Sequence, residues 1–140
     1  MKLHIVARGR IGRGPEAELV ERYVKRLTWP TVTTELPDSG GKAPEALAPL
    51  RTIALDEGGD PLTSIALARL LGAWRDDGVR ETRFLIGAAD GLTAAERTSA
   101  DRTLSFGTLT WPHLLVRAML AEQLYRATTI LAGHPYHRDG

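Results

Sequence analysis

Hydrophobic and polar positions follow two different periods along the chain. Residues 2–8 alternate, which places Leu3, Ile5 and Ala7 on one face of a predicted strand. After Pro15, apolar residues follow helical spacing, and proline suits the first turn of a helix. Further short runs are β-branched or continuously apolar and are predicted as strands: residues 31–36, 52–56, 83–86 and 104–110.

Capping residues predict where the remaining helices begin. Thr63 can cap a helix that ends at Gly78, and Thr93-Ala94-Ala95-Glu96 is a capping box that starts another helix. A short helix is predicted to end near Pro49, and a mostly apolar helix to run from residue 113 to about 130. Because strands and helices alternate, we predict an α/β fold with a largely parallel sheet.

Length and composition narrow the class of protein. The chain has 140 residues, which is ordinary for one domain, so residues 1–140 are expected to form a single domain. It contains no cysteine, which excludes disulfides and thiolate metal sites and fits a reducing compartment. No apolar run is long enough to span a membrane, and the first residues do not resemble a signal peptide. We therefore expect a cytoplasmic protein with no membrane partner.

Positive charge is concentrated near the start of the chain, although the net charge is only +1. Arg8, Arg10 and Arg13 lie in a glycine-rich stretch that follows the first strand and could contact RNA phosphates. The alternative is an ordinary solvated loop and helix face.

Unusual segments follow three of the predicted strands. They are the glycine loop Glu57-Gly58-Gly59, the glycine loop Gly87-Ala88-Ala89-Asp90-Gly91 and the segment Thr108-Leu109-Thr110-Trp111-Pro112-His113. In open α/β sheets, ligands bind beyond the carboxyl ends of the strands, and glycines let the backbone approach a ligand closely. Such glycines can also simply turn the chain. A fourth candidate segment combines proton carriers, an aromatic ring and a cation: His134-Pro135-Tyr136-His137-Arg138.

Five motifs, in this order, resemble one family of RNA-modifying enzymes. They are Leu55-Asp56-Glu57 with Gly59 and Thr63-Ser64, Leu85-Ile86-Gly87-Ala88-Ala89-Asp90-Gly91, Leu109-Thr110-Trp111-Pro112-His113-Leu114-Leu115-Val116-Arg117, Glu122-Gln123-Leu124-Tyr125-Arg126-Ala127 and His134-Pro135-Tyr136-His137-Arg138. The family is that of the large-subunit ribosomal RNA pseudouridine N3-methyltransferases (RlmH), in the SPOUT superfamily. The resemblance covers about two thirds of the chain, and five ordered motifs are far more specific than one.

The resemblance implies a SPOUT-type α/β domain with a C-terminal trefoil knot, a homodimer and S-adenosylmethionine as cofactor, without a metal. It also implies methyl transfer to N3 of a pseudouridine, in ribosomal RNA of the large subunit or the assembled ribosome. The positions that match the family's cofactor site are Leu55, Gly87, Ala88, Gly107, Thr108, Leu109, Thr110, Trp111 and Pro112. At Ala88 the family has glycine, and the added methyl could crowd the cofactor or demand a different backbone angle.

The last motif supplies candidates for the chemistry. The target nitrogen lies between two carbonyls and must lose a proton before or during methyl transfer. His137 is the candidate general base, Arg138 could stabilise charge on a carbonyl oxygen, and Tyr136 could stack on an RNA base. Glu122 and Arg126 are four residues apart and could pair along a helix or across a dimer interface.

Two other functions fit parts of the sequence. Gly12-Arg13-Gly14-Pro15-Glu16-Ala17 fits the dinucleotide-binding pattern G-x-G-x-x-A, and Glu35 lies about where a ribose-binding acid belongs. The pattern is weak alone, and the chain is short for two nucleotide-binding halves. The second alternative is a non-catalytic RNA-binding module, in which Ala88 and Ala89 mark a decayed cofactor site.

Overall fold

The computed structural model describes residues 1–138 and has a parallel five-stranded sheet at its centre. The strands are β1 (Lys2–Arg8), β2 (Thr31–Leu36), β3 (Leu50–Asp60), β4 (Glu81–Ile86) and β5 (Arg102–Leu104). Their order in the sheet is β2-β1-β4-β3-β5, and every neighbouring pair is parallel. The predicted α/β fold with a parallel sheet is therefore confirmed.

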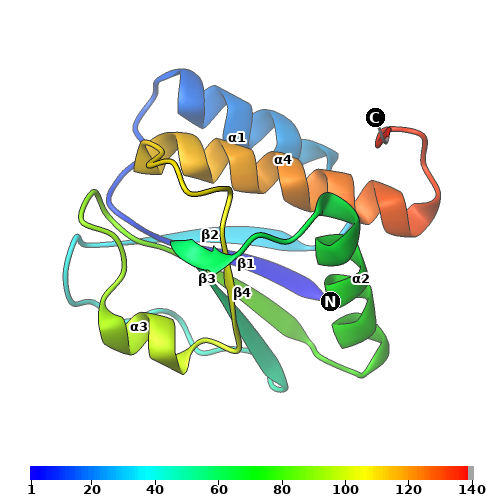
Figure 1. Ribbon diagram of the computed structural model, residues 1–140, viewed down its shortest axis with the longest axis horizontal. Coiled ribbons are helices and arrows are strands. Elements are labelled where there is room, and N and C mark those ends of the chain that lie inside the picture. Colours follow the sequence, from blue (N-terminus) through cyan, green and yellow to red (C-terminus); the bar gives the residue numbers. More distant parts are fainter. Residues whose placement is uncertain (139–140) are drawn as a thin grey trace.

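Three helices cover one face of this sheet. They are α1 (Pro15–Arg26), α2 (Ser64–Asp76) and α4 (His113–Ala132), and α4 packs between the other two. The short helix α3 (Ala94–Ser99) lies on the side of the sheet away from α1 and α4 (Figure 1). Within residues 1–138, no helix is both long and apolar enough to cross a membrane.

The alternating pattern of β1 builds the core as predicted. Leu3, Ile5 and Ala7 are fully or almost fully buried and face the layer of helices. The same core takes large apolar side chains from β4, α2 and α4: Phe84, Leu67, Leu71, Leu120 and Leu124. Burial of these side chains is the main force that holds α2 and α4 on the sheet.

The opposite face of the sheet is buried by an irregular segment, residues 37–49, and by polar side chains. The carboxylate of Glu81, which is fully buried, accepts hydrogen bonds from Arg83 and from the backbone N–H of Leu47 and lies 3.2 Å from His4 Nδ1. Arg83 also donates to the carbonyl oxygen of Pro44. The predicted short helix near Pro49 is wrong, because this segment bonds to β4 side chains across the sheet and stays extended.

Helix starts agree with the predicted caps. The Thr63 hydroxyl accepts a hydrogen bond of 3.0 Å from the N–H of Ala66, and α2 begins at the next residue. The capping box is complete, because Thr93 and Glu96 each accept a hydrogen bond from the other's backbone N–H. Gly78 follows α2 with a φ of +89°, a conformation that glycine adopts without strain.

The last predicted strand is wrong in its position. Strand β5 covers only Arg102–Leu104, and residues 105–112 form a loop. The Ser105 hydroxyl lies 3.0 Å from the carbonyl oxygen of Glu57 and 2.9 Å from that of Gly107, and it can donate its one hydrogen to either. Such local hydrogen bonds replace the ladder that a longer strand would have made. Strand β3 extends to Asp60 through the predicted glycine loop, with an irregular register opposite β5. The trefoil knot stays a prediction.

Candidate active site

A cavity of about 340 Å³ lies at the carboxyl ends of β4 and β5 and beside the second half of β3. Its volume lies in the range of about 300–1,000 Å³ that is usual for small-molecule sites. Three stretches supply most of its walls: residues 55–57, 86–92 and 104–113. The second and third stretches begin at the last residues of β4 and β5, and residues 55–57 lie in β3 directly after its pairing with β4 ends at Ala54. This is the edge of the sheet where ligands bind in open α/β folds.

The cavity collects most of the residues that the sequence assigns to the cofactor. Those that line it are Leu55, Gly87, Ala88, Gly107, Leu109, Thr110 and Trp111. Thr108 and Pro112 lie in the same loop but are not part of the lining. The side chains of Leu109 and Trp111 are 71% and 40% exposed, which is unusual for large apolar groups and provides a surface for a flat apolar ring.

The loop after β4 is folded tightly on itself. The N–H of Gly91 donates to the carbonyl oxygen of Ala88 at 2.8 Å. A Cβ atom on Gly87 would lie 2.6 Å from the nitrogen of Leu92, so this position accepts only glycine. Ala88 has no positive φ, and its methyl group therefore needs no change of backbone angle.

Ionisable side chains at the cavity add further hydrogen-bonding groups. Asp56, Glu57 and Asp90 line it together with Arg97 and His113. The Thr110 hydroxyl donates to the Glu57 carboxylate at 3.0 Å, and Arg97 donates to the carbonyl oxygen of Leu92 at 2.6 Å. Arg97 is not among the residues predicted from the sequence, because a basic residue in a short helix after a capping box does not indicate a ligand.

This lining fits a ligand that combines a flat apolar ring with charged groups. Apolar side chains can flank the ring, glycine backbone can approach it, and the carboxylates can accept hydrogen bonds from a positively charged amine. An adenosyl sulfonium compound with an amino-acid tail has these features.

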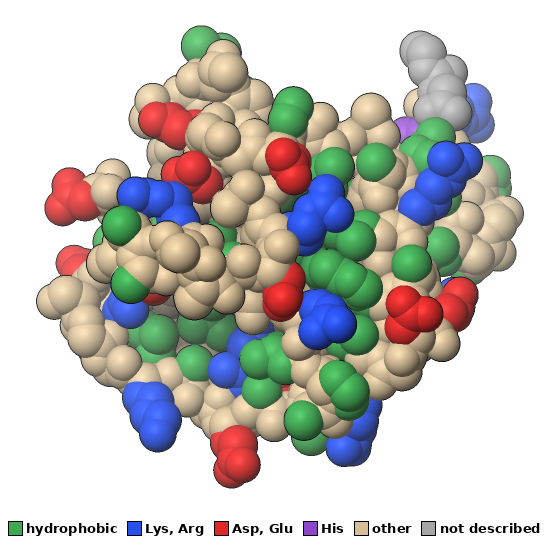
Figure 2. All heavy atoms as spheres, turned by 60° about the horizontal axis from the view of Figure 1, so that its bottom comes forward, with side chains coloured by type: hydrophobic (Ala, Val, Ile, Leu, Met, Phe, Trp, Pro, Cys, Tyr) green, Lys and Arg blue, Asp and Glu red, His purple; other side chains and the backbone are tan. Residues whose placement is uncertain are grey.

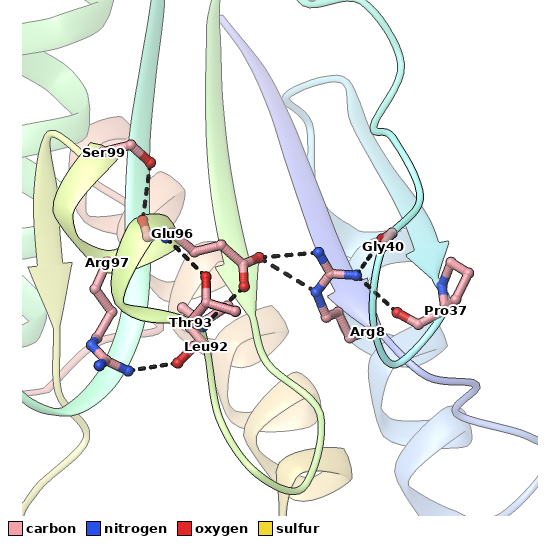
Figure 3. Close-up of polar contacts among 8 residues, drawn as sticks. All are labelled: Arg8, Pro37, Gly40, Leu92, Thr93, Glu96, Arg97 and Ser99. Carbon is pink, nitrogen blue, oxygen red and sulfur yellow. Dashed lines mark hydrogen bonds and ion pairs between the residues drawn. The ribbon is translucent and has the colours of Figure 1, made fainter.

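The three arginines predicted to contact RNA differ in their surroundings. Arg10 and Arg13 are exposed. Arg8 instead uses its guanidinium inside the protein, where it donates to Glu96 and to the carbonyl oxygens of Pro37 and Gly40 (Figure 3). On the face that Figure 2 shows, basic and acidic side chains are interspersed, with no large patch of one sign.

The acid proposed for dinucleotide binding already has partners. Glu35 accepts hydrogen bonds from the buried Arg117 and from the N–H of Ile11, the latter at 2.8 Å. Burial opposes the shift, but these bonds hold the pKa of Glu35 below its usual value of 4.5. Arg117 also donates to the carbonyl oxygens of Arg8 and Gly9. Glu35 therefore ties α4 to the glycine-rich stretch and is not available to a ribose.

The residues after α4 fold back onto that helix. The Tyr136 hydroxyl donates to the Glu122 carboxylate at 3.1 Å, and its ring packs edge-on against Tyr125 at 4.7 Å. Arg126 Nη1 lies 3.0 Å from His137 Nδ1. The predicted pair of Glu122 and Arg126 is confirmed at 2.6 Å.

These residues do not reach the cavity of their own chain. His113 lines the cavity at the start of α4, and Arg126, which contacts His137, is thirteen residues further along. That spacing corresponds to about 20 Å along a helix axis. Figure 1 shows the two ends of α4 on opposite sides of the molecule. The structure therefore does not bring His137 and Arg138 together with the predicted cofactor residues.

A second hollow, of about 260 Å³, lies between α1 and α4. Its lining is mostly apolar and includes Leu19, Tyr23, Phe106, Leu115, Ala118 and Met119. None of the residues of α1 is fully buried, so this groove leaves part of both helices without cover.

Sequence comparisons identify similar proteins over the full length. A family model described as predicted SPOUT methyltransferase matches residues 1–137. A protein from Sphingopyxis alaskensis, named ribosomal RNA large subunit methyltransferase H, is 66% identical over 140 residues, which cover 100% of this chain and 99% of that protein. A protein of the same name from Zymomonas mobilis is 60% identical over 142 residues and is covered completely.

Structure comparisons find the same architecture at low sequence identity. A probable methyltransferase from Bordetella pertussis superimposes with a TM-score of 0.61 and 15% identity, over 89% of this chain and 95% of that chain. The SpoU methyltransferase AviRb from Streptomyces viridochromogenes, in complex with the cofactor AdoMet, superimposes with a TM-score of 0.51 and 15% identity. The superposition covers 91% of this chain and 57% of that chain. At such identity the likeness concerns the fold alone.

Proposed function

The chain belongs to the SPOUT methyltransferase family. We propose that it methylates N3 of a pseudouridine in large-subunit ribosomal RNA, with S-adenosylmethionine as cofactor. Relatives that are 60% and 66% identical over their whole length are named ribosomal RNA large subunit methyltransferases. Methylation of large-subunit RNA follows from that identity. The nucleotide and the nitrogen rest on the motif resemblance. The assignment of residues 1–140 to one domain rests on the length of the chain, and the proposed cytoplasmic location rests on its composition and its first residues.

The observation that carries the proposal is the cavity at the carboxyl ends of β4 and β5 and beside the second half of β3. When bound there, S-adenosylmethionine supplies a methyl group that is already activated by a positively charged sulfur. Leu55, Ile86, Leu109 and Trp111 would flank the adenine ring, and the backbone of residues 87–91 would approach it closely. A cavity with this lining argues against a decayed site in a non-catalytic RNA-binding module.

The residues that follow α4 supply the groups for proton removal from the target base and for RNA binding. His137 removes the proton from the target nitrogen, Arg138 stabilises negative charge on a neighbouring carbonyl oxygen, and Tyr136 stacks on RNA. Arg10 and Arg13 add exposed positive charge for phosphate contacts.

A homodimer is part of this proposal, because the cavity and the end of the chain are far apart in one protomer. The groove between α1 and α4 offers an apolar surface that a second copy can cover by an isologous contact. If the contact runs along α4, the end of one chain lies near the cavity of its partner. Each active site then takes its cofactor residues from one chain and its base from the other.

One experiment tests the reaction. Ribosomes from a strain without the enzyme are incubated with the protein and isotopically labelled S-adenosylmethionine, and the RNA is digested and examined by mass spectrometry. We expect one labelled methyl group on N3 of a pseudouridine in the large-subunit RNA. A label on another base, on ribose or on small-subunit RNA contradicts the proposed target.

A further inference from the structure

Arg8 ties together three segments that are distant in sequence. It is the last residue of β1, and its Nη1 donates to the carbonyl oxygens of Pro37 and Gly40 at 2.9 and 2.6 Å. Its Nε and Nη2 donate to one carboxylate oxygen of Glu96 at 3.4 and 3.3 Å. Figure 3 shows Arg8 between the loop at residues 37–40 and the start of α3.

Glu96 is shared between this ion pair and the start of α3. While one of its oxygens accepts from Arg8, the other accepts from the N–H of Thr93 at 3.0 Å. The Thr93 hydroxyl in turn accepts from the N–H of Glu96 at 3.1 Å. The side chains of Arg8 and Glu96 are only 15% and 22% exposed, so solvent screens their attraction less than that of an exposed pair.

The start of α3 is also the end of the cavity loop. Thr93 directly follows Leu92, which is 7% exposed and lines the cavity, and Arg97 of α3 donates to the Leu92 carbonyl oxygen at 2.6 Å. The backbone of Gly91 and Leu92 lies against Gly87, with no space for even a Cβ atom. The position of Thr93 therefore determines how residues 87–92 close around the cavity.

These contacts leave Arg8 little capacity for RNA. An arginine has five N–H donors, and the hydrogen bonds to Glu96, Pro37 and Gly40 use four of them. A phosphate would have to compete with a carboxylate that is already in place. Arg13, which lies in the same glycine-rich stretch, is exposed and has no such competitor among the described contacts.

We infer that Arg8 and Glu96 are positioning residues that hold residues 87–92 in the shape that receives the cofactor, and that Arg8 does not contact RNA. The inference rests on the proposed function, in which this cavity binds S-adenosylmethionine. It also links cofactor affinity to the loop at residues 37–40, which Arg8 holds through two carbonyl oxygens.

The test uses the full-length protein and isothermal calorimetry with S-adenosylmethionine. Glu96→Gln removes the charge that Arg8 binds but keeps a residue that completes a capping box. We expect Glu96→Gln and Arg8→Ala each to weaken cofactor binding about tenfold, and the double variant to be little weaker than either, because interacting residues are not additive. In ribosome methylation, KM for the cofactor rises while kcat at saturating cofactor changes little.

RNA binding separates this role from a phosphate contact. Arg8→Ala should leave the salt dependence of ribosomal RNA binding unchanged, whereas Arg13→Ala should flatten it without changing cofactor affinity. The inference is overturned if Arg8→Ala flattens the salt dependence and binds the cofactor normally. If Arg8→Ala unfolds, Glu96→Gln decides alone, and normal cofactor binding by that variant overturns the inference. If the wild-type protein gives no heat with millimolar cofactor, the proposed function itself fails.

Discussion

At the scale of single residues, the cavity loop depends on the absence of a side chain at Gly87. A Cβ atom there would contact the carbonyl carbon of Gly91 and lie 2.6 Å from the nitrogen of Leu92. Both neighbours are backbone atoms, which cannot rotate away as the end of a flexible side chain can. A single methyl group at this position would therefore open the loop.

We expect Gly87→Ala to weaken S-adenosylmethionine binding by about tenfold or more, since overpacking a tight site costs about 1–3 kcal/mol. Calorimetry provides the measurement. Gly58→Ala is the matched control, because its Cβ would meet only the Asp56 carboxylate, at 3.3 Å. Ala88→Gly should bind no worse than wild type. Equal affinities for Gly87→Ala and Gly58→Ala would contradict the steric argument.

A second residue-scale feature is the buried histidine on the other face of the sheet. Burial lowers the pKa of His4 below 6.5, even though the hydrogen bond with Glu81 raises it. Arg83 and Lys2 also face the Glu81 carboxylate, and Thr34 lies 2.7 Å from His4 Nε2. The folded protein thus keeps His4 neutral at a pH where the unfolded chain binds a proton.

The free energy of unfolding should therefore fall as the pH is lowered below 6.5, because the unfolded chain then binds more protons than the folded protein. Urea denaturation at several pH values, from about 8 down to about 5, measures the slope. His4→Gln should make the curve flatter in this window. A slope that is equally steep in His4→Gln would show that other groups cause it.

At the scale of elements, α4 connects the cavity, the core and the end of the chain. His113 lines the cavity, Leu120 and Leu124 are buried in the core, and Glu122 and Arg126 hold the residues that follow the helix. The helix ends at Ala132 and is capped by Gly133, whose φ of +73° turns the chain back toward these two side chains.

This packing raises the pH at which the Tyr136 phenol loses its proton. Burial, followed by the Glu122 carboxylate, raises the pKa of Tyr136 to about 12 from an ordinary 10.0. The stability that this phenol contributes is present below pH 10 and is lost as the pH rises from 10 toward 12. A spectrophotometric titration should show a phenolate component near pH 12 that Tyr136→Phe removes. Its persistence in Tyr136→Phe would assign it to another tyrosine.

Local signals explain which elements the sequence could predict. Strand β1, the start of α1 and both threonine caps depend on residues within one or two turns of each other, and all are confirmed. The wrong predictions involve partners that are far apart in sequence. Ser105 bonds to Glu57, and the segment near Pro49 is held by β4 side chains.

The same limit applies to the candidate site. The cavity residues could be found because their motifs resemble those of a family. The role of Arg8 could not, since its partner Glu96 lies 88 residues away and a basic residue in a glycine-rich stretch suggests RNA. The separation between the cavity and His137 also becomes visible only when α4 is seen as one straight element.

At the scale of the whole molecule, one protomer holds two halves of a proposed active site that do not meet. The cavity lies at the start of α4, and His137 contacts Arg126 near the other end. A dimer that covers the groove between α1 and α4 can bring the halves of two chains together.

Mixed dimers test this arrangement. Gly87→Ala weakens cofactor binding and His137→Ala removes the proposed base. At a cofactor concentration well below the Kd of Gly87→Ala, we therefore expect each variant alone to be inactive or slow, by about 10²–10⁴-fold for the base. After unfolding and refolding as an equal mixture, shared active sites should restore about a quarter of wild-type activity, because half of the dimers then contain one complete site. Light scattering measures whether the wild-type protein, both variants and the mixture are dimers. No recovery in the mixture would show that each chain uses its own His137.

The positions of the cavity walls along the sequence also determine when, during synthesis of the chain, the cavity can form. The cavity needs residues near 55, 87 and 107, and β5, only three residues long, adds the last strand beside it. A nascent chain that has left the ribosome only as far as β4 lacks both β5 and the loop that follows β5. Because a ligand stabilises only the state that binds it, the cofactor can favour the folded protein only after synthesis is nearly finished. The methyl donor can therefore stabilise only a chain that already includes β5 and the loop after it.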